Sequence, residues 1–477
     1  MRSSRLLFWA TLLLIPFFSS CEKEDMISTS VDLLEAGFEG GRFTVTVQAS
    51  SHWTVVANYR PPSAEERANY QEPVWYLPSG GPVTDTGWIS INVSEGDAGT
   101  TDIVIDIDTY NKSFRGGSVV FKLTESGKVL VVPVYQLGKQ ETDISDRLSP
   151  AMKEFLKAKH NFESFRYKDI FQIKELFLDG QTFDFTDDLV YFEQTWALHC
   201  SNCGITSFTS KMPSLTTLYC SDNLLTSIDP DLFPKLEFAD CSRNPLKTMD
   251  ILSAPKLRRL YLHGVPLKEL SLGPGLIKVG CRECGLERLD LSQATDLEYL
   301  DCAFNNLKEL DASRTQASII DCHNNPGLNK LVVPEKDCLE CLFASSCSLS
   351  GQLSISSNTI CEVSVYNNKL EKLSLDGPNL EYVYCADNSL TEIVLPKNTS
   401  RVLRLHCENN LLTELRGITE KFNWEGCSIS GNPGKDGIFT LYVSDKVNAY
   451  YVEAYALHWQ WQWQGQDISV KVVIVPS

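Results

Sequence analysis

One short pattern recurs thirteen times between residues 172 and 434, and it limits the possible fold more than any other feature. The pattern is L-x-x-L-x-(C/L)-x-x-N-x-L-x-x-L, and its sixth positions are 19 to 22 residues apart. A unit of this length cannot bury its apolar face alone, so neighbouring units stack and share a continuous core. We therefore expect a solenoid in which every copy adds one parallel strand to a long sheet. The sixth positions are Leu178, Cys200, Cys220, Cys241, Leu262, Cys281, Cys302, Cys322, Ala344, Val365, Cys385, Cys407 and Ile429.

The ninth position of the pattern supports the same fold. A buried amide at this position can satisfy backbone groups of neighbouring turns. Asparagine fills it at Asn223, Asn244, Asn305, Asn325, Asn368, Asn388, Asn410 and Asn432, and cysteine replaces it at Cys203, Cys284 and Cys347. The pattern resembles the leucine-rich repeats of Bacteroidetes surface proteins, in which cysteine at the sixth position is frequent. The resemblance implies about 13 repeats over residues 172–434, with a parallel sheet on a concave face.

Most of the 16 cysteines are explained as packing residues of this repeat. The C-x-x-C pairs are Cys200/Cys203, Cys281/Cys284 and Cys338/Cys341. The first two pairs occupy repeat positions that point inward, so we expect no metal site. Cys341 and Cys361 fall at the entries of adjacent strands, one position out of register, and a disulfide is expected there if one forms. The redox states of Cys338, Cys341 and Cys361 stay open.

The first residues carry the features of a secretory signal. A basic start is followed by the apolar run Leu6 to Phe18 and then by Ser19-Ser20-Cys21, so residues 1–20 are predicted to be cleaved. The ending resembles a bacterial lipobox, which implies lipid modification of Cys21 and a lipidated tether over residues 21–27. The acidic run after Cys21 is similar to the tag that sends Bacteroidetes lipoproteins to the outer face of the outer membrane. The alternatives are an ordinary cleavage site and a solvated tether.

Residues 28–138 alternate between apolar and polar side chains with glycine-rich punctuation, which predicts an immunoglobulin-like β-sandwich. The order of its glycines and tryptophans resembles a BACON domain, and this implies either carbohydrate binding or a spacer role. Trp53 and Trp88 fit strand positions and are expected in the core. A long insert supplies aromatic candidates for an exposed sugar platform, namely Tyr59, Tyr70, Trp75 and Tyr76.

Two flanking segments complete the domain plan. Residues 139–171 are predicted to be a linker and a helical cap, because Ser149 can cap a helix that has Pro150 in its first turn. Residues 435–477 are predicted to cap the other end of the array, whose last turn would otherwise leave an apolar face open. Trp459, Trp461 and Trp463 alternate with glutamine, so they either cover that end or form a sugar platform.

The candidate binding site is a set of aromatic and imidazole side chains at the variable strand positions, which we expect on the concave face. Exposed aromatic groups beside scattered charge are typical of recognition surfaces, although long side chains could also simply cover the sheet. The candidates are Phe177, His199, Tyr219, Phe238, Tyr261, Tyr299, Phe304, Phe343, Tyr366, Tyr382, Tyr384 and His406.

The charge and the motif content narrow the function. The chain has 61 acidic and 43 basic residues and a net charge of −18, which disfavours a nucleic-acid partner. It lacks the nucleophile, zinc-protease, phosphate-loop and dinucleotide motifs. Asp240, Asp301 and Asp321 share one column, but on a flat face we expect no shift of their pKa values. We therefore expect a non-enzymatic, cofactor-free surface protein that binds a protein ligand, with a glycan as the alternative ligand.

Overall fold

The computed structural model describes residues 25–58, 87–111, 114–334, 337–396, 403–419, 422, 426–444 and 460–476. The predicted signal peptide, Cys21, the insert aromatics and Trp459 lie outside the described residues. The chain divides into two compact units, one with residues 1–146 and 164–168 and the other with residues 147–163 and 169–477. The expected linker, residues 139–171, is thus divided between the two. Among the described segments, no helix has the length and apolar character needed to cross a membrane.

The first unit contains two sheets that share one core. In the first sheet the strand order is β1 (Ile27–Thr29), β3 (Gly41–Ala49), β7 (Gly99–Ile107) and β5 (Ile89–Ile91), all antiparallel. In the second sheet the order is β2 (Leu34–Ala36), β9 (Val129–Leu137), β8 (Phe114–Leu123), β4 (Trp53–Asn58) and β6 (Glu95–Gly96). Alternate residues of both sheets pack into the shared core. The immunoglobulin-like and BACON-like assignments stay predictions.

Both described tryptophans of the first unit lie in this core, as their strand positions predict. Trp53 is fully buried and Trp88 is 6% exposed, so neither can serve as a sugar platform. The indole nitrogen of Trp53 donates a hydrogen bond of 3.2 Å to the carbonyl oxygen of Asp97. A Cβ on Gly96 would lie 2.3 Å from the Trp53 ring, which explains the glycine in β6.

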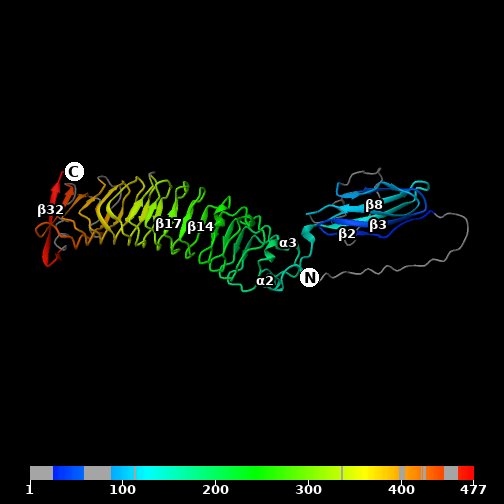
Figure 1. Ribbon diagram of the computed structural model, residues 1–477, viewed down its shortest axis with the longest axis horizontal. Coiled ribbons are helices and arrows are strands. Elements are labelled where there is room, and N and C mark those ends of the chain that lie inside the picture. Colours follow the sequence, from blue (N-terminus) through cyan, green and yellow to red (C-terminus); the bar gives the residue numbers. More distant parts are fainter. Residues whose placement is uncertain are drawn as a thin grey trace. The chain divides into compact units, whose positions relative to one another are not determined.

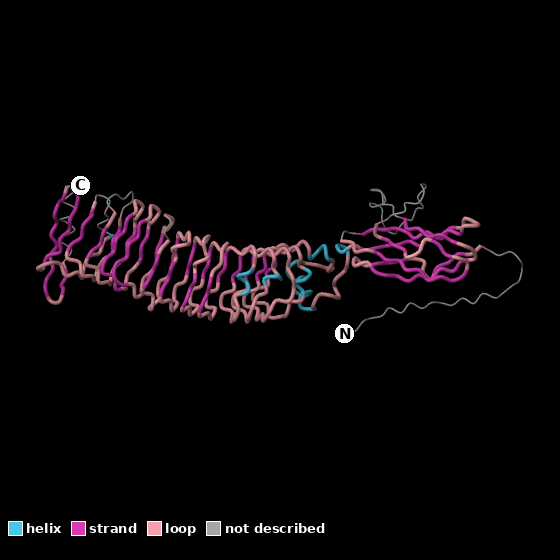
Figure 2. The backbone as a smooth tube through the Cα atoms, turned by 45° about the horizontal axis from the view of Figure 1, so that its top comes forward, coloured by secondary structure: helices cyan, strands magenta, loops and turns pink. Residues whose placement is uncertain are grey.

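The second unit begins with a capped helix. Helix α2 spans Pro150–His160, and its N-cap Ser149 accepts a hydrogen bond of 3.1 Å from the Met152 amide. The Ser149 hydroxyl also donates to the Asp188 carboxylate at 2.6 Å, which ties the helix start to the first repeat. The other helical segments are α3 (Tyr167–Ile170), η1 (Lys139–Glu141), η2 (Asp188–Tyr191), η3 (Pro230–Leu232) and η4 (Asp250–Ser253). Figure 2 shows helical segments near the start of the repeat array and strands through the rest.

The repeat array is a solenoid of parallel strands, which confirms the expected architecture (Figure 1). Its main sheet has twelve strands, and in sequence terms each is the third to fifth position of a repeat. The strands are β10 (Glu175–Phe177), β11 (Ala197–His199), β12 (Thr217–Tyr219), β13 (Phe238–Asp240), β14 (Arg259–Tyr261), β16 (Lys278–Gly280), β18 (Tyr299–Asp301), β20 (Ile319–Asp321), β22 (Cys341–Phe343), β24 (Glu362–Ser364), β26 (Tyr382–Tyr384) and β28 (Arg404–His406). The described residues of the thirteenth repeat pair with the twelfth through isolated bridges, Leu403 with Phe422 and His406 with Ser428, where the pattern predicted a full strand.

Shorter sheets follow the other side of the repeats and close the end of the array. The side sheets contain β15 (Glu269–Ser271) with β17 (Arg288–Asp290), β19 (Glu309–Asp311) with β21 (Lys330–Val332), and β23 (Ser350–Ser356) with β25 (Lys369–Asp376) and β27 (Glu392–Val394). The last sheet contains β29 (Glu414–Ile418), β30 (Ile438–Ser444), β32 (Gln466–Val475) and β31 (Trp461–Trp463). Trp461 packs edge-on against the buried Phe439 and donates a hydrogen bond of 2.7 Å to the carbonyl oxygen of Asn432. It therefore covers the last turn of the array.

The asparagine ladder joins the repeats from inside. The Asn223 amide donates to the carbonyl oxygens of Cys200 and Cys220 at 2.8 and 2.9 Å, and its oxygen accepts from the amides of Cys203 and Ile205. Where cysteine replaces asparagine, the thiol takes over the donor half: Cys203 donates to the Leu178 carbonyl at 3.0 Å. Each ladder residue thus satisfies backbone groups of two turns.

A column of left-handed residues runs beside this ladder, at the eighth position of every repeat. A left-handed conformation suits glycine and is tolerated by asparagine and aspartate, which fill nine of the thirteen positions. The column is Gly180, Asn202, Asp222, Arg243, Gly264, Glu283, Phe304, Asn324, Ser346, Asn367, Asp387, Asn409 and Gly431. The bend after each strand therefore carries a conformational cost at Arg243, Glu283, Phe304 and Ser346.

Candidate functional site

The outward side of the main sheet gathers most of the candidate side chains. In all twelve main-sheet strands the middle residue is buried, and in eight of them the first and third residues are at least partly exposed. The parallel register places third residues in one row, so that Phe177 pairs with His199 and His199 with Tyr219. We call this surface the main-sheet face and include in it the residue before each strand and the residues two and three positions after it.

Six rings on the main-sheet face form a continuous stack, the aromatic ribbon. Its first pairs are parallel, with ring centroids 4.4 Å apart for Phe177 and His199 and 4.6 Å apart for His199 and Tyr219. The stack continues at 4.8, 5.7 and 5.6 Å between successive rings. These separations are those of favourable aromatic pairs, each worth about 0.5–1.5 kcal/mol beyond the area it buries. The ribbon consists of Phe177, His199, Tyr219, Phe238, Tyr261 and His263.

At β13 the ribbon moves from the third residue of the strand to the first. The third residue of β13 is Asp240, so Phe238, the first residue of that strand, supplies the ring between Tyr219 and Tyr261. The guanidinium of Arg259 lies 5.2 Å from the Phe238 ring centre. Gly280 ends this row, because a Cβ there would lie within 2.7 Å of both His263 and Tyr261. The glycine therefore makes room for the last two rings of the ribbon.

Beyond Gly280 lies a group of charged and aromatic side chains that we call the central cluster. It consists of Arg282, Tyr299, Asp301, Phe304, Asp321 and His323. Asp301 is 9% exposed and accepts a hydrogen bond of 3.1 Å from the Ala303 amide. Burial raises the pKa of Asp301, and the charge of Asp321 raises it further against the opposing Ala303 hydrogen bond. Burial also raises the pKa of Tyr299, with Asp301 the next largest cause. The expectation of unshifted carboxylates on a flat face is therefore wrong for Asp301, because its neighbours exclude water from it.

The raised pKa of Asp301 predicts a pH-dependent stability. A carboxyl whose folded-state pKa lies above its unfolded value binds more protons when folded, so its contribution to stability falls as pH rises between the two values. Asp301→Asn removes the charge and keeps an oxygen for the Ala303 amide. We expect this variant to melt at a higher temperature than the parent at about pH 7.5, and the difference to vanish at about pH 3.

The control for this pH dependence is Asp311→Asn. Hydrogen bonds from the hydroxyl and the amide of Ser313 lower the pKa of Asp311, so the sign is reversed. Asp311→Asn should lower the melting temperature at neutral pH and lose this effect in acid. Melting curves of both variants by circular dichroism at the two pH values check the prediction. Equal shifts of the same sign would contradict it.

Phe304 combines exposure with backbone strain. Its side chain is 40% exposed although its φ is +55°, a left-handed conformation that is costly for a bulky residue. The Arg282 guanidinium lies 4.3 Å from its ring centre, and the His323 ring meets it edge-on at 4.9 Å. His323 in turn contacts the Asp321 carboxylate through Nδ1. The strained turn thus presents an aromatic ring outward in the middle of the face.

Replacing this ring should stabilise the fold. Four repeats carry asparagine at the position of Phe304, so Phe304→Asn relieves the strain with a residue that the turn accepts. We expect the free energy of unfolding to rise by about 1 kcal/mol in urea titrations. The reverse change in the next repeat, Asn324→Phe, should lower it by a similar amount. A destabilised Phe304→Asn would show that the packing of the ring outweighs the strain.

The C-terminal part of the face holds a smaller aromatic group. The rings of Tyr382 and Tyr384 lie 6.4 Å apart, and Tyr384 meets His406 at 5.2 Å. The Arg404 guanidinium lies 4.8 Å from the Tyr382 ring centre. Phe343 lies partly exposed on β22 between this group and the central cluster, and Tyr366 is 45% exposed beyond the end of β24. The structure therefore gathers ten of the twelve candidates into three groups on one face, with Phe343 and Tyr366 between the last two groups.

Three residues that complete this face were not among the candidates predicted from the sequence. His263, Arg282 and His323 occupy the position two residues after a strand, which the repeat pattern treats as the start of a turn. His263 accepts a hydrogen bond of 3.2 Å from the Arg282 amide through Nδ1, so its neutral form carries the proton on Nε2. Serine or alanine fills seven of the other ten copies of this position, so the bulky exceptions could have indicated them. Among the described residues, no group of three or more histidine, cysteine or acidic side chains could hold a metal ion.

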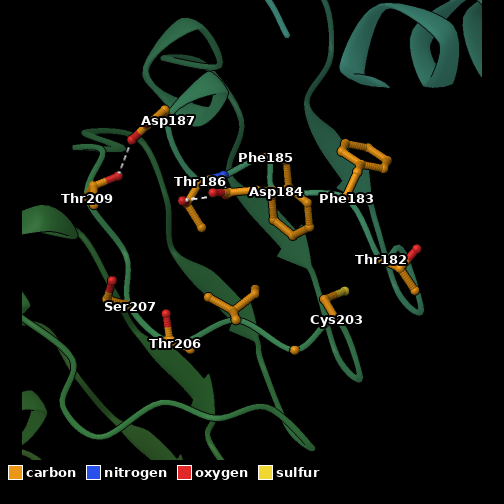
Figure 3. Close-up of a pocket in the computed structure, with 12 residues that line it drawn as sticks. Thr182, Phe183, Asp184, Phe185, Thr186, Asp187, Cys203, Thr206, Ser207 and Thr209 are labelled. Carbon is orange, nitrogen blue, oxygen red and sulfur yellow. Dashed lines mark hydrogen bonds between the residues drawn. The ribbon is translucent and has the colours of Figure 1, made fainter. Parts of the chain in front are cut away.

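A hollow of about 350 Å³ lies away from these residues, in the loops that follow β10 and β11 (Figure 3). Both of its acidic side chains are paired: Thr209 donates to Asp187 at 2.8 Å and Thr186 to Asp184 at 2.9 Å. Phe183 and Phe185 line another part of its wall. Because both carboxylates are already paired, the hollow offers little chemistry compared with the main-sheet face.

Comparisons with known proteins give partial structural matches. No model of a known protein family matches the chain, and no curated protein sequence matches it. The leucine-rich repeat domain of APL1B matches at 17% identity over 68% of this chain and 98% of that domain, with a TM-score of 0.42. The functional domain of InlJ from Listeria monocytogenes, which includes a cysteine ladder, matches at 19% identity over 58% of this chain and 70% of that one, with a TM-score of 0.37.

A xyloglucanase of Bacteroides ovatus, solved with a heptasaccharide, also matches part of the chain. The identity is 11%, and the match covers 25% of this chain with a TM-score of 0.18. The chain spans only 21% of the length of the xyloglucanase. The repeat architecture and the geometry of the main-sheet face are therefore established from this chain's own residues.

Proposed function

We propose that the chain is a non-enzymatic recognition protein that binds a protein ligand through the main-sheet face. The observation that carries this proposal is the aromatic ribbon, in which six rings stack continuously over five neighbouring strands. Phe177, at one end of it, is 55% exposed. Exposed aromatic residues flanked by arginine provide most of the binding energy in protein interfaces.

The stack also favours binding because it is preorganised. Neighbouring rings hold one another in place, so a partner orders fewer side chains when it binds. Arg259 beside Phe238 and Arg282 beside Phe304 add charged hydrogen-bond donors at the edge of the apolar strip. An apolar strip with a polar border is the usual composition of a protein-binding surface.

Binding measurements on substituted ribbons test the proposal. The chain is immobilised and exposed to purified secreted and matrix proteins, including fibronectin, laminin and collagen, and in parallel to a glycan array. For a protein that binds the parent, Tyr219→Ala with Tyr261→Ala should raise the dissociation constant about 100-fold, since two such side chains carry 2 kcal/mol or more. Val394→Ala is the control, because Val394 is 46% exposed on a side sheet. Unchanged protein binding by the ribbon variant contradicts the proposal, and ribbon-dependent glycan binding replaces the protein ligand with a sugar.

We also propose that the chain is exported and anchored to the outer membrane by lipid on Cys21, facing outside. The support is the sequence of residues 1–25, in which an apolar run too short to span a bilayer is followed by two serines and Cys21. Two or more acyl chains on one cysteine would give stable membrane attachment. Incorporation of labelled palmitate by the parent, and its loss in Cys21→Ala, is the expected result. Labelling that persists in the variant excludes this anchor.

The first unit would then hold the repeat array away from the membrane. Its two described tryptophans are buried, which removes them as sugar contacts and favours the spacer role over carbohydrate binding. A glycan array with the full chain and with the double variant Tyr219→Ala, Tyr261→Ala tests the spacer role. Sugar binding that survives in the variant would point to a sugar site in the first unit.

A further inference from the structure

Two cysteines on the main-sheet face lie next to each other in neighbouring repeats. The Sγ atoms of Cys341 and Cys361 are 3.6 Å apart, and both side chains are partly exposed. Cys341 is the first residue of β22 and pairs with Glu362 of β24, so Cys361 is offset from it by one residue. This offset lets the two side chains approach from adjacent parallel strands, whereas side chains in direct register stack side by side.

The other described cysteines have different surroundings. Eight fill the sixth position of their repeats and are fully buried in the core, and three donate hydrogen bonds in the ladder. Cys338 donates to the carbonyl oxygen of Ala317 at 3.8 Å, and Cys427 is partly exposed in the thirteenth repeat. Cys220 and Cys241 are also close, with their Sγ atoms 3.9 Å apart, but both are fully buried and cannot be reached by an oxidant without unfolding. Among the described residues, Cys341 and Cys361 therefore form the accessible thiol pair.

We propose that Cys341 and Cys361 are a site of oxidation, at which a disulfide joins the ninth and tenth repeats on the main-sheet face. A disulfide requires the two sulfur atoms at about 2.05 Å and the two Cα atoms at about 4.4–6.8 Å. Adjacent strands of a sheet are about 4.8 Å apart, and the offset of one residue adds about 3.3 Å along the strand, so a Cα separation of about 5.8 Å is expected, which meets the second condition. The sulfur atoms need to move by about 1.5 Å, a shift that side-chain rotation supplies.

The oxidant is a disulfide, such as oxidised glutathione or an exported disulfide oxidoreductase. One thiolate attacks a sulfur of the oxidant and releases its first thiol, which leaves a mixed disulfide on the chain. The neighbouring cysteine then attacks that mixed disulfide and releases the second thiol. The two cysteines lose two protons and two electrons in total, and the oxidant accepts them as two thiols.

The local environment sets the rate of this reaction. Burial and the hydrogen bond with Cys361 raise the pKa of the Cys341 thiol to about 12. The thiolate is the attacking species, so uncatalysed exchange is slow near neutral pH and faster in alkaline buffer. The two thiols are therefore expected to remain reduced in a reducing cytosol and to pair in an oxidising compartment.

Peptide mapping of the full chain tests the proposal. The folded protein is incubated with oxidised glutathione at about pH 8.5, alkylated in denaturant without reduction, and digested. Trypsin yields one peptide, residues 337–369, which contains Cys338, Cys341, Cys347 and Cys361. A second cut by a glutamate-specific protease after Glu340 separates Cys338 from the proposed pair. We expect Cys341 and Cys361 to lose alkylation together, while Cys347 stays alkylated.

Two controls make the outcome decisive. Cys220 and Cys241 should stay fully alkylated in the same sample, because proximity without access is insufficient. Cys341→Ser should leave Cys361 alkylated or carrying glutathione, and the rise in melting temperature that oxidation gives the parent should be absent from this variant. Full alkylation of Cys341 and Cys361 after oxidation, or a bridge from either of them to Cys338, overturns the proposal.

Discussion

Asn305→Ala is expected to lower the free energy of unfolding of the repeat array by about 4 kcal/mol. The buried Asn305 amide donates to the carbonyl oxygens of Cys281 and Cys302, both at 2.9 Å, and to that of Ala303 at 3.2 Å. Its oxygen accepts from the amides of Cys284 at 3.0 Å and Leu286 at 2.9 Å. Alanine leaves these backbone groups buried without partners, which costs more than the net value of the bonds themselves.

Other repeats of the chain suggest a substitution of Asn305 with an intermediate effect on stability. Cys284 shows that a thiol at the ladder position donates to the carbonyl oxygen of Leu262 at 2.9 Å. Asn305→Cys should therefore keep one donor, to the carbonyl oxygen of Cys281, and lose the second amide hydrogen and the acceptor for Cys284 and Leu286. We expect a loss of about 2 kcal/mol, intermediate between the parent and the alanine variant.

Urea titration and hydrogen exchange measure these differences. Each repeat contacts only its neighbours, so exchange should accelerate most at the amides of Cys284 and Leu286. Asn306→Ala is the matched control, because its exposed side chain makes only a long contact of 3.5 Å to Gly285, and it should change stability by less than about 0.5 kcal/mol. Equal effects of Asn305→Ala and Asn306→Ala would show that the ladder contributes nothing specific.

The sequence predicts this ladder well because its chemistry is periodic. Asparagine recurs at one position of a pattern whose spacing already places that position beside the backbone of neighbouring turns. The same spacing places residues such as Tyr219 and Tyr261 in one outward row. Periodicity therefore predicts which side chains share a face, since each strand repeats the geometry of the previous one.

Contacts between the side chains of that face could not be predicted in this way. The ribbon passes from Tyr219 to Phe238 because Asp240 interrupts its row, and it ends where Gly280 leaves space for His263. Both features depend on rotamers and on vacant volume, which a repeat pattern does not describe. The raised pKa of Asp301 has the same origin, because its burial comes from neighbouring side chains.

The left-handed column was missed although the sequence contains its signal. Glycine, asparagine and aspartate fill most of the eighth positions, and this composition indicates a turn with positive φ. The exceptions carry further information, because Phe304 occupies the position at a conformational cost. A residue that departs from the turn chemistry and also lies on the main-sheet face is a candidate for function, which neither property alone would indicate.

Gln136→Met is expected to destabilise the first unit by about 3 kcal/mol. Gln136 is fully buried, and its oxygen accepts a hydrogen bond of 2.8 Å from Arg115 Nε. Its amide group donates to the carbonyl oxygens of Gly37 at 2.9 Å and Asp108 at 2.8 Å. This side chain therefore links the loops next to β2 and β7 to strand β8. Methionine has a similar length and volume, so the expected loss comes from the hydrogen bonds and not from a cavity.

Hydrogen exchange along β9 and urea titration of the full chain measure the effect of Gln136→Met. Gln48→Met is the control, because Gln48 is exposed on β3 and the change should shift stability by less than about 0.5 kcal/mol. The Arg115 guanidinium also lies between two rings, 4.1 Å from the centre of Trp88 and 4.4 Å from that of Tyr110. A neutral Gln136→Met would mean that this stacking holds Arg115 without the amide, whereas a loss near the expected value shows that the buried hydrogen bonds fix the guanidinium between the rings.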